Sequence, residues 1–448
     1  MVSAMLNEMK FNTSLGISAI FYNSDFSKLS NYISSATQEF KSRANMPGQF
    51  LNWVDLPKHQ LARLDEIYSL ASKFKSQTNA KYLTVLGIGG SKHTVENMLN
   101  INGLNIGNRE VLFYSDVDSA SFNRYLYLLR NDVTASNYMV ASKSGSTFET
   151  KDGFLRLKKM LEDAYLAKGI SSAEATKKAA SHFIAVTDKN PDKSELRRMS
   201  DSEGWLGNLY IHDDVGGRFS ALDDHSLFAL AYAGMPKSDM ETMLKAAQSM
   251  SELSLCSDFG LNLAYAEAAF WSAARIDNIY SSVHQYLGSM FDCAVNWHSQ
   301  MQNESVKDTS KQIAKVPDAM HHSSEAHFNP DNKFAFALTV PSDHGVSSEN
   351  AMGYIGALSK SYSDAGAYFC EYLETRKMGL TPESAGAMVQ LRAFATVYQE
   401  IIMSLYNSTT LPEVLASVLQ PHVEVYKKNL KPQADGRDVV VAGRISDN

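Results

Sequence analysis

From about residue 81 onward, short β-rich runs alternate with longer helical patterns, and this alternation constrains the fold more than any other feature. Lys81–Ile88 has the composition of a buried strand, and Phe154, Leu157 and Leu161 mark the apolar face of a later helix. Further short strands are expected over residues 111–115, 138–142, 183–187 and 209–212. Strands that alternate with helices form βαβ units, in which the strands pair in parallel. The sequence therefore predicts an α/β fold.

The second half of the chain returns to this pattern after about residue 235, with more helix. Strands are expected over Ile279–His284 and Lys333–Val340, and helices over Met290–Glu304 and from Thr381 to about Leu405. A chain of 448 residues is long enough for two large lobes. We expect a helical extension that packs on the large lobe (residues 1–80), a small lobe (81–230), the large lobe (231–410) and a C-terminal tail (411–448).

The composition excludes several classes of protein. Lys and Arg number 42 and Asp and Glu 49, and the resulting net charge of −7 does not support nucleic-acid binding, which needs a basic face. The 3 cysteines lie far apart, which argues against disulfides and cysteine zinc sites and fits a reducing compartment. Apolar runs fall short of the ~18 residues of a membrane span, and Met1–Phe21 lacks the pattern of a signal peptide. We therefore expect a cytoplasmic protein without membrane or nucleic-acid partners.

A glycine-rich turn follows the first of the expected strands. Gly87, Gly89 and Gly90 precede Ser91 and a helix, so that backbone N–H groups and the positive end of the helix dipole can face an anion. The dinucleotide-binding pattern would need glycine at position 92, where this chain has Lys92. The turn is therefore either an anion site or an ordinary tight connection, and a nicotinamide-dependent dehydrogenase is disfavoured.

A second turn, over residues 142–147, is crowded with hydrogen-bond donors. Its hydroxyls and one ammonium group belong to Ser142, Lys143, Ser144, Ser146 and Thr147. Hydroxyls together with the amides of a helix N-terminus form a donor-rich cup that suits a phosphate dianion. The alternative is an ordinary capping box, which would explain only Ser146 and Glu149. The sequence favours the phosphate cup, although both can hold together.

Two later segments could carry proton chemistry. In Gly216–Gly217–Arg218 the glycines let the backbone approach a ligand and the guanidinium can face negative charge, although a surface turn would look the same. Gln300 and Glu304, spaced i, i+4, share one face of a helix, where Glu304 can act as a general base or simply be solvated.

Histidines and lysines complete the set of candidates. His321, His322 and His327 lack the ligand spacing of a metal motif, so we expect no metal and favour proton transfer by one of them, or plain surface histidines. Lys427 lies in the last expected helix, where a lysine taken alone would be solvated.

Taken in order, these segments resemble the phosphoglucose isomerase (glucose-6-phosphate isomerase) family from about residue 80 to about residue 430. The resemblance implies two α/β/α sandwich lobes of the sugar-isomerase type, each with a mainly parallel sheet, plus helical N- and C-terminal extensions. It also implies a homodimer in which each active site takes a histidine from the neighbouring subunit. The implied reaction interconverts glucose 6-phosphate and fructose 6-phosphate in glycolysis and gluconeogenesis, through ring opening and a cis-enediolate, without metal or organic cofactor.

The same resemblance implies a role for each matching residue. Glu304 would move a proton between C2 and C1, and Arg218 would stabilise the enediolate. His322 and Lys427 would assist ring opening. The residues implied to bind the sugar phosphate are Gly89, Ser91, Ser142, Lys143, Ser144, Thr147, Gly217, Gln300 and Gln420.

Some positions depart from the family pattern and leave alternatives open. His321 precedes His322 where the family has Gln, so His321 or His327 can be the ring-opening residue instead. After its base the family usually has Ser-x-Gly-Lys, whereas here Glu304 and Ser305 lead into Val306 and Lys307, which is one residue shorter. The family also usually has glycine two residues after the glutamine of the last motif, where this chain has His422 after Gln420. A sugar-phosphate sensor on the same fold and an isomerase that also accepts mannose 6-phosphate remain as competing hypotheses. An amidotransferase is disfavoured because the N-terminal cysteine nucleophile is missing.

Overall fold

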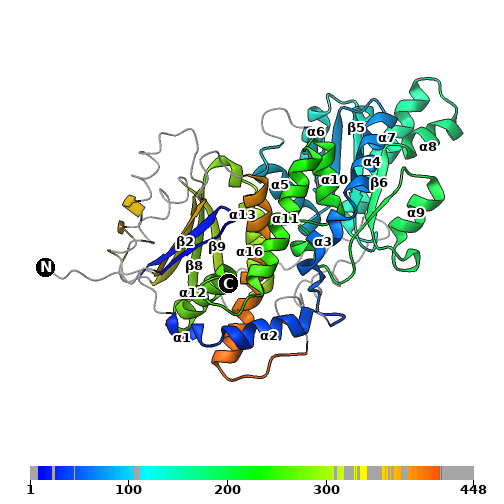
Figure 1. The fold of residues 1–448 in the computed structure, drawn as a ribbon. Helices are drawn as coiled ribbons and strands as arrows, with labels where there is room; N and C mark the ends of the chain where they lie inside the picture. Colours follow the sequence, from blue (N-terminus) through cyan, green and yellow to red (C-terminus); the bar gives the residue numbers. More distant parts are fainter. Residues whose placement is uncertain are drawn as a thin grey trace, which may run out of the picture.

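The computed structural model places two β-sheets at opposite ends of one molecule, with helices between them (Figure 1). The residues that it describes are 9–22, 26–44, 46–104, 110–306, 310–316, 327, 329, 333–340, 356–358, 360–361, 364, 368–374, 381–413 and 415. All structural statements below concern these residues. Most of the expected C-terminal tail, with Gln420 and Lys427, lies outside them, as does His322.

The first sheet has five strands, in the order β4-β3-β5-β6-β7, and all of its pairings are parallel. The strands are β3 (Tyr82–Leu86), β4 (Val111–Tyr114), β5 (Ser136–Ala141), β6 (Phe183–Thr187) and β7 (Asn208–Tyr210). The five strands expected from the alternating pattern are thereby confirmed, with small shifts at their ends. Parallel strands of this kind are joined by helical crossovers, which the helical stretches between them supply.

Helices cover both faces of this sheet. Tyr138 and Val140 of β5 point into a cluster with helices α6 (Ser119–Leu128), α7 (Phe148–Ala167) and α8 (Ser172–Ala180). Met139 and Ala141 point the other way, into a core shared with α4 (Leu64–Gln77), α5 (Gly90–Ile101) and α10 (Asp224–Tyr232). Because side chains alternate along a strand, a strand buried on both faces reads as a continuous apolar run.

The second sheet has six strands, in the order β1-β2-β11-β10-β8-β9. Its parallel part consists of β8 (Ser281–Leu287), β9 (Ser310–Val316), β10 (Phe334–Val340) and β11 (Tyr368–Glu374). Strands β8 and β10 were expected from the sequence. The hairpin of β1 (Met9–Asn12) and β2 (Ile17–Tyr22) joins the sheet antiparallel to β11.

This hairpin corrects the expectation that residues 1–80 are a helical extension. Ile17, Ala19 and Phe21 of β2 are buried, so the strand shows the alternation of a sheet with one face in the core. A two-stranded hairpin is only marginally stable alone, and here β11 supplies the third strand from more than 340 residues away. The expected helices do follow, as α1 (Ser27–Ser30), α2 (Ile33–Ala44), α3 (Leu56–Leu61) and α4.

Helices α11 (Lys237–Ser254), α12 (Leu263–Ile276), α13 (Ala294–Ser305) and α16 (Pro382–Tyr406) form the centre of the molecule (Figure 1). As expected, α16 begins with Thr381 as its N-cap, whose side chain accepts from the Ser384 N–H, and with Pro382 in its first turn. Nearly every side chain of α16 is buried, from Ser384 to Ile402. One hydrophobic core therefore runs without a break from strand β3 to helix α16.

The boundary expected at residue 230 falls inside helix α10. That helix packs on α4 and α5 beside the five-stranded sheet, whereas α11 packs on α16. Among the described residues, no helix combines the length and the apolar character that crossing a membrane would require.

Close contact between α11 and α16 generates a prediction. A Cβ atom at Gly386 would lie 2.0 Å from the backbone oxygen of Met243. Glycine to alanine normally favours a helix by up to ~1 kcal/mol, but here the helices would have to separate. We expect Gly386→Ala to lower the free energy of unfolding by about 1–3 kcal/mol, measured by chemical denaturation.

Gly207→Ala is the matched control, because the nearest atom that its Cβ would meet in the described part of the chain is Leu70 Cδ1, at an ordinary 3.6 Å. Equal denaturation midpoints for the two variants would show that α11 and α16 do not approach as closely as described.

Candidate active site

The glycine-rich turn after β3 touches the loop that carries Arg218. Gly89 has a φ of 54°, a conformation that glycine adopts without strain, and α5 begins directly after it. A Cβ atom at Gly90 would lie 2.1 Å from the carbonyl carbon of Gly217. Gly217 opens the short 3-10 helix η4 (Gly217–Phe219). The two glycine-containing segments that the sequence singled out are therefore in direct contact.

Helix α13 brings Gln300 and Glu304 to the same place. Gln300 Nε2 donates to Glu304 Oε1 at 3.0 Å, as the i, i+4 spacing predicted. A Cβ atom at Gly89 would lie 3.0 Å from the same Gln300 Nε2 atom. The turn after β3 thus packs against the Gln300 side chain of α13.

Arg218 lies beside Glu304. Its Nη1 atom is 3.7 Å from Glu304 Oε2, and its Nε donates to Ser305 Oγ at 2.7 Å. The arginine side chain is 3% exposed and that of Glu304 is 25% exposed. Burial lowers the pKa of Arg218 to about 10, although the Glu304 carboxylate acts in the opposite direction. The site therefore pairs a buried guanidinium with a carboxyl group that a ligand can still reach.

The hydroxyl-rich turn lies between β5 and α7, and its hydroxyls bond within the turn. Ser142 Oγ accepts from the Gly145 N–H at 3.0 Å and lies 3.1 Å from Thr147 Oγ1. Ser144 Oγ lies 2.6 Å from Ser146 Oγ and accepts from the Ser146 N–H at 3.2 Å. This network explains why hydroxyls crowd the turn, and it holds them at the helix N-terminus.

The capping-box alternative for this turn is wrong. The N-cap of α7 is Thr147 rather than Ser146, and in this fully described turn it makes no side-chain capping bond. Because the Thr147 hydroxyl lies against Ser142 and Ser146 is turned toward Ser144, the first amides of α7 are left without the usual side-chain acceptor. Amides at the N-terminus of a 20-residue helix favour an anion.

The two turns leave the same edge of the five-stranded sheet. Strands β3 and β5 are parallel neighbours, with Leu86 opposite Val140. A Cβ at Gly87 would lie 3.3 Å from the Cβ of Ala141 and 3.2 Å from that of Ser91. Ligands of open parallel sheets bind at this carboxyl edge. The hydroxyl turn, the glycine turn and the Gln300–Glu304–Arg218 group therefore form a continuous series of contacts.

Most candidates from the sequence are accounted for in this way. Gly89, Gly217, Arg218, Gln300 and Glu304 come together, and the turns that carry Ser91, Ser142, Ser144 and Thr147 adjoin them. The Lys143 side chain is exposed, and its backbone oxygen accepts from Thr187 Oγ1 at 3.1 Å. His321, His322, Gln420 and Lys427 lie outside the described residues.

His327, the remaining histidine alternative, is buried in an apolar setting. Its ring packs against the rings of Phe334 and Phe336, at 5.2 and 5.1 Å between centroids. Burial lowers its pKa. A histidine enclosed and kept neutral in this way is poorly suited to exchanging protons with a bound sugar.

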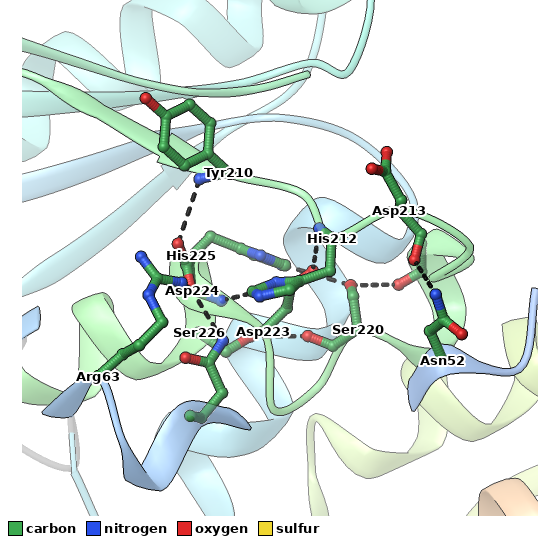
Figure 2. Close-up of polar contacts among 12 residues, drawn as sticks. Asn52, Arg63, Tyr210, His212, Asp213, Ser220, Asp223, Asp224, His225 and Ser226 are labelled. Atoms are coloured by element: carbon green, nitrogen blue, oxygen red, sulfur yellow. Dashed lines mark hydrogen bonds and ion pairs between the residues drawn. The ribbon is translucent and has the colours of Figure 1, made fainter. Parts of the chain in front are cut away.

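The loop that carries Arg218 is closed by a polar cluster that the sequence analysis missed (Figure 2). His212 Nδ1 lies 2.6 Å from Asp223 Oδ1, so the beginning and end of the loop are joined. Asp224 accepts from Arg63 at 2.6 Å, from Gln60 at 2.8 Å and from the Tyr210 N–H at 3.2 Å. The pair Asp223–Asp224 directly before an apolar helix was the available sequence signal, as an N-cap followed by an acidic first turn.

His212, Asp223 and Asp224 have ligand atoms within 4.8 Å of one another, which is close enough for a metal ion. Each carboxylate oxygen of the pair, however, already accepts a hydrogen bond from the protein. We therefore interpret the cluster as the closure of the loop rather than as a metal centre.

The chain is similar to known proteins in sequence and in fold. No family model matches the chain. It is 30% identical over 322 residues to a glucose-6-phosphate isomerase of Clostridium novyi (strain NT), covering 67% of this chain and 64% of that protein. It is 26% identical over 437 residues to one of Mycoplasmopsis pulmonis (strain UAB CTIP), covering 90% and 95%. The match thus spans a little under two thirds of the first relative's length and nearly all of the second's.

Solved structures share the fold. The crystal structure of a glucose-6-phosphate isomerase from Chlamydia trachomatis has a TM-score of 0.74 at 16% identity, covering 94% of this chain and 88% of that one. A hypothetical protein from Thermus thermophilus has a TM-score of 0.73 at 22% identity, covering 90% and 95%. The expected two-sheet architecture of this family is thereby confirmed.

The His212–Asp223 contact generates a pH prediction. Burial by itself would lower the His212 pKa, but the hydrogen bond and charge of Asp223 outweigh it, and the pKa is raised above 6.5. A raised histidine pKa stabilises the fold fully below about pH 6.5, and this stabilisation is lost as the pH rises through the folded-state value. We expect the difference in unfolding free energy between wild type and His212→Gln to shrink over that range.

Chemical denaturation at a series of pH values measures this difference. His59→Gln, at an exposed histidine of α3, is the control and should reproduce the wild-type profile. If the difference in unfolding free energy between wild type and His212→Gln does not change with pH, His212 and Asp223 do not form a charged pair.

Proposed function

Because this chain belongs to the glucose-6-phosphate isomerase family, we propose that it is an aldose–ketose isomerase that interconverts glucose 6-phosphate and fructose 6-phosphate. The single observation that carries the proposal is the 3.7 Å approach of the Arg218 guanidinium to the Glu304 carboxylate. A base and a fixed cation at one point are what proton transfer next to a carbonyl requires. The reaction would serve glycolysis and gluconeogenesis.

In the proposed reaction Glu304 removes the proton from C2 of the open-chain sugar. The electrons form a C1–C2 double bond, and the carbonyl oxygen at C1 takes the negative charge of an enediolate. A proton then moves from the C2 oxygen to the C1 oxygen, and Glu304 returns its proton to C1, which leaves the ketose. Only protons move, so the proposed chemistry needs no metal or organic cofactor.

Magnitudes explain why the base alone does not suffice. A carboxylate has a pKa near ~4.3, and each unit of mismatch with the weakly acidic C2 proton costs about 1.4 kcal/mol. A preorganised cation next to the developing charge contributes several kcal/mol in a site with little water. Arg218 meets this need because it is buried and already oriented before substrate binds.

The remaining parts of the proposal concern substrate binding. The hydroxyls of residues 142–147 and the first amides of α7 would hold the phosphate, with Ser91 and Gly89 beside the sugar. His322, Lys427 and Gln420 keep the ring-opening and positioning roles that the family resemblance implies. We also propose a cytoplasmic homodimer whose subunits share active sites.

The base is tested by Glu304→Gln. The amide keeps the shape of the side chain but cannot accept the C2 proton, so we expect kcat to fall at least about 10³-fold while sugar phosphate still binds. Conversion of fructose 6-phosphate, followed by a coupled glucose 6-phosphate assay with a chelator present, measures the rate.

Glu252→Gln on α11, at an exposed carboxylate, is the matched control and should keep wild-type activity. Normal turnover by Glu304→Gln would end the assignment of the base. A wild-type protein that converts neither sugar phosphate would end the proposed function itself.

The cation is tested by Arg218→Lys. An ammonium keeps the charge but cannot bond Ser305 and face Glu304 with two separate nitrogens. We expect kcat to fall about 10²- to 10³-fold, as for the loss of one preorganised donor to an oxyanion. Arg124→Lys, on the exposed side of α6, should leave kcat unchanged. An active Arg218→Lys enzyme would mean that the guanidinium geometry does not matter.

A further inference from the structure

Helix α13 contacts Arg218 at both its backbone and its side chain. Trp297 Nε1 donates to the Arg218 carbonyl oxygen at 3.1 Å. Two turns later along the helix, Ser305 Oγ accepts from Arg218 Nε at 2.7 Å. Trp297 and Ser305 are both 2% exposed, so water does not compete strongly for either bond. The helix that carries the base therefore also fixes the cation.

The bond to Ser305 determines where the guanidinium points. The group is planar, so a hydrogen bond at Nε fixes the rotation of the plane and with it the directions of both terminal nitrogens. In this orientation Nη1 faces Glu304 Oε2, and the ring of Phe219 lies 5.1 Å from the guanidinium carbon. Among the contacts that the described residues make with the Arg218 guanidinium, the ring contact and the longer ion pair hold the plane less firmly than the Ser305 bond does.

The inner face of α13 keeps this arrangement rigid. Gln302 Nε2 donates to Thr396 Oγ1 of α16 at 2.7 Å, and His298 Nδ1 lies 2.9 Å from the Tyr286 hydroxyl of β8. These buried contacts alternate along the helix with Gln300 and Glu304 on its outer face. A shift of the helix would move base and cation together rather than separate them.

We propose that Ser305 is a positioning residue of the isomerase site, which sets the Arg218 guanidinium for the enediolate, with Trp297 holding the backbone of the same residue. The proposal rests on the proposed function. Ser305 directly follows the base Glu304 in the sequence. Its neutral hydroxyl would act on the reaction through Arg218 and would not contact the substrate.

The alternative is a merely structural role, in which Ser305 satisfies a buried nitrogen and nothing more. The two differ in what Ser305→Ala would change. Loss of structure alone would lower the melting temperature and leave kcat and its pH dependence as they are. Loss of positioning would lower kcat about 10- to 100-fold and leave the KM for fructose 6-phosphate nearly unchanged, because the phosphate contacts remain.

The pH profile adds a second distinction. A hydrogen bond to the charged form of a base raises its pKa, so removing the Ser305 hydroxyl lowers the pKa of Arg218 further. The alkaline limb of the kcat profile should therefore move to lower pH in Ser305→Ala. Ser305→Thr, which keeps the hydroxyl, should restore most of the rate and the position of the limb.

The experiment measures kcat, KM, melting temperature and the alkaline limb for the full-length wild type, Ser305→Ala and Ser305→Thr. Ser299→Ala is the matched control, because Ser299 lies on the same helix and its hydroxyl accepts from Asn303 at the surface rather than from Arg218. The Nε–H resonance of Arg218, assigned by its loss in Arg218→Lys, reports on the bond without any turnover. It should shift in Ser305→Ala and keep its position in Ser299→Ala.

Wild-type kcat, an unmoved alkaline limb or an unshifted Nε–H resonance in a folded Ser305→Ala protein would overturn the proposal and leave the proposed function intact. If Ser305→Ala does not fold, a Ser305→Thr variant with kcat reduced as far as in Arg218→Lys would overturn it instead. A wild type without isomerase activity would overturn the proposed function, and the role of Ser305 would fall with it.

Discussion

The burial of Arg218 beside Glu304 is the interaction on which the rest of the site depends. A guanidinium removed from water is costly unless it is paired and hydrogen-bonded. Here Glu304, the Ser305 hydroxyl and the Phe219 ring all contact it. The backbone that carries the cation lies this close to the turn after β3 because Gly90 has no Cβ atom, which would otherwise clash with Gly217. The burial of the cation therefore depends both on its hydrogen-bond and ion-pair partners and on the close backbone approach that glycine permits.

Around that interaction, the fold brings together four segments that are distant along the chain. The turns after β3 and β5 share one sheet edge because their strands are parallel neighbours. The His212–Asp223 contact closes the loop that carries Arg218. Helix α13 contacts both strand β9 of the second sheet and helix α5 beside the first. A single core spanning both sheets holds these segments in register. The rigidity of the site is therefore a property of the whole molecule.

Much of this could be predicted from sequence patterns with a local cause. The βαβ alternation, the Thr381–Pro382 helix start and the Gln300–Glu304 pair each depend on residues a few positions apart. The predictions failed where a distant partner decided the outcome. Residues 9–22 form strands because β11 pairs with them, and β11 lies more than 340 residues away along the chain. The contacts of Arg218 with Trp297 and Ser305 span about 80 residues and leave no local pattern.

By itself, the sequence determined which elements form and which chemical groups are available, because hydrophobic periodicity and turn residues act over one or two turns of chain. It also supplied the order of motifs that pointed to the family. Only the tertiary structure decided that the carboxylate of Glu304 and the guanidinium of Arg218 meet at 3.7 Å. That distance follows from how two sheets and their helices pack on a common core, and packing is set by all the side chains together.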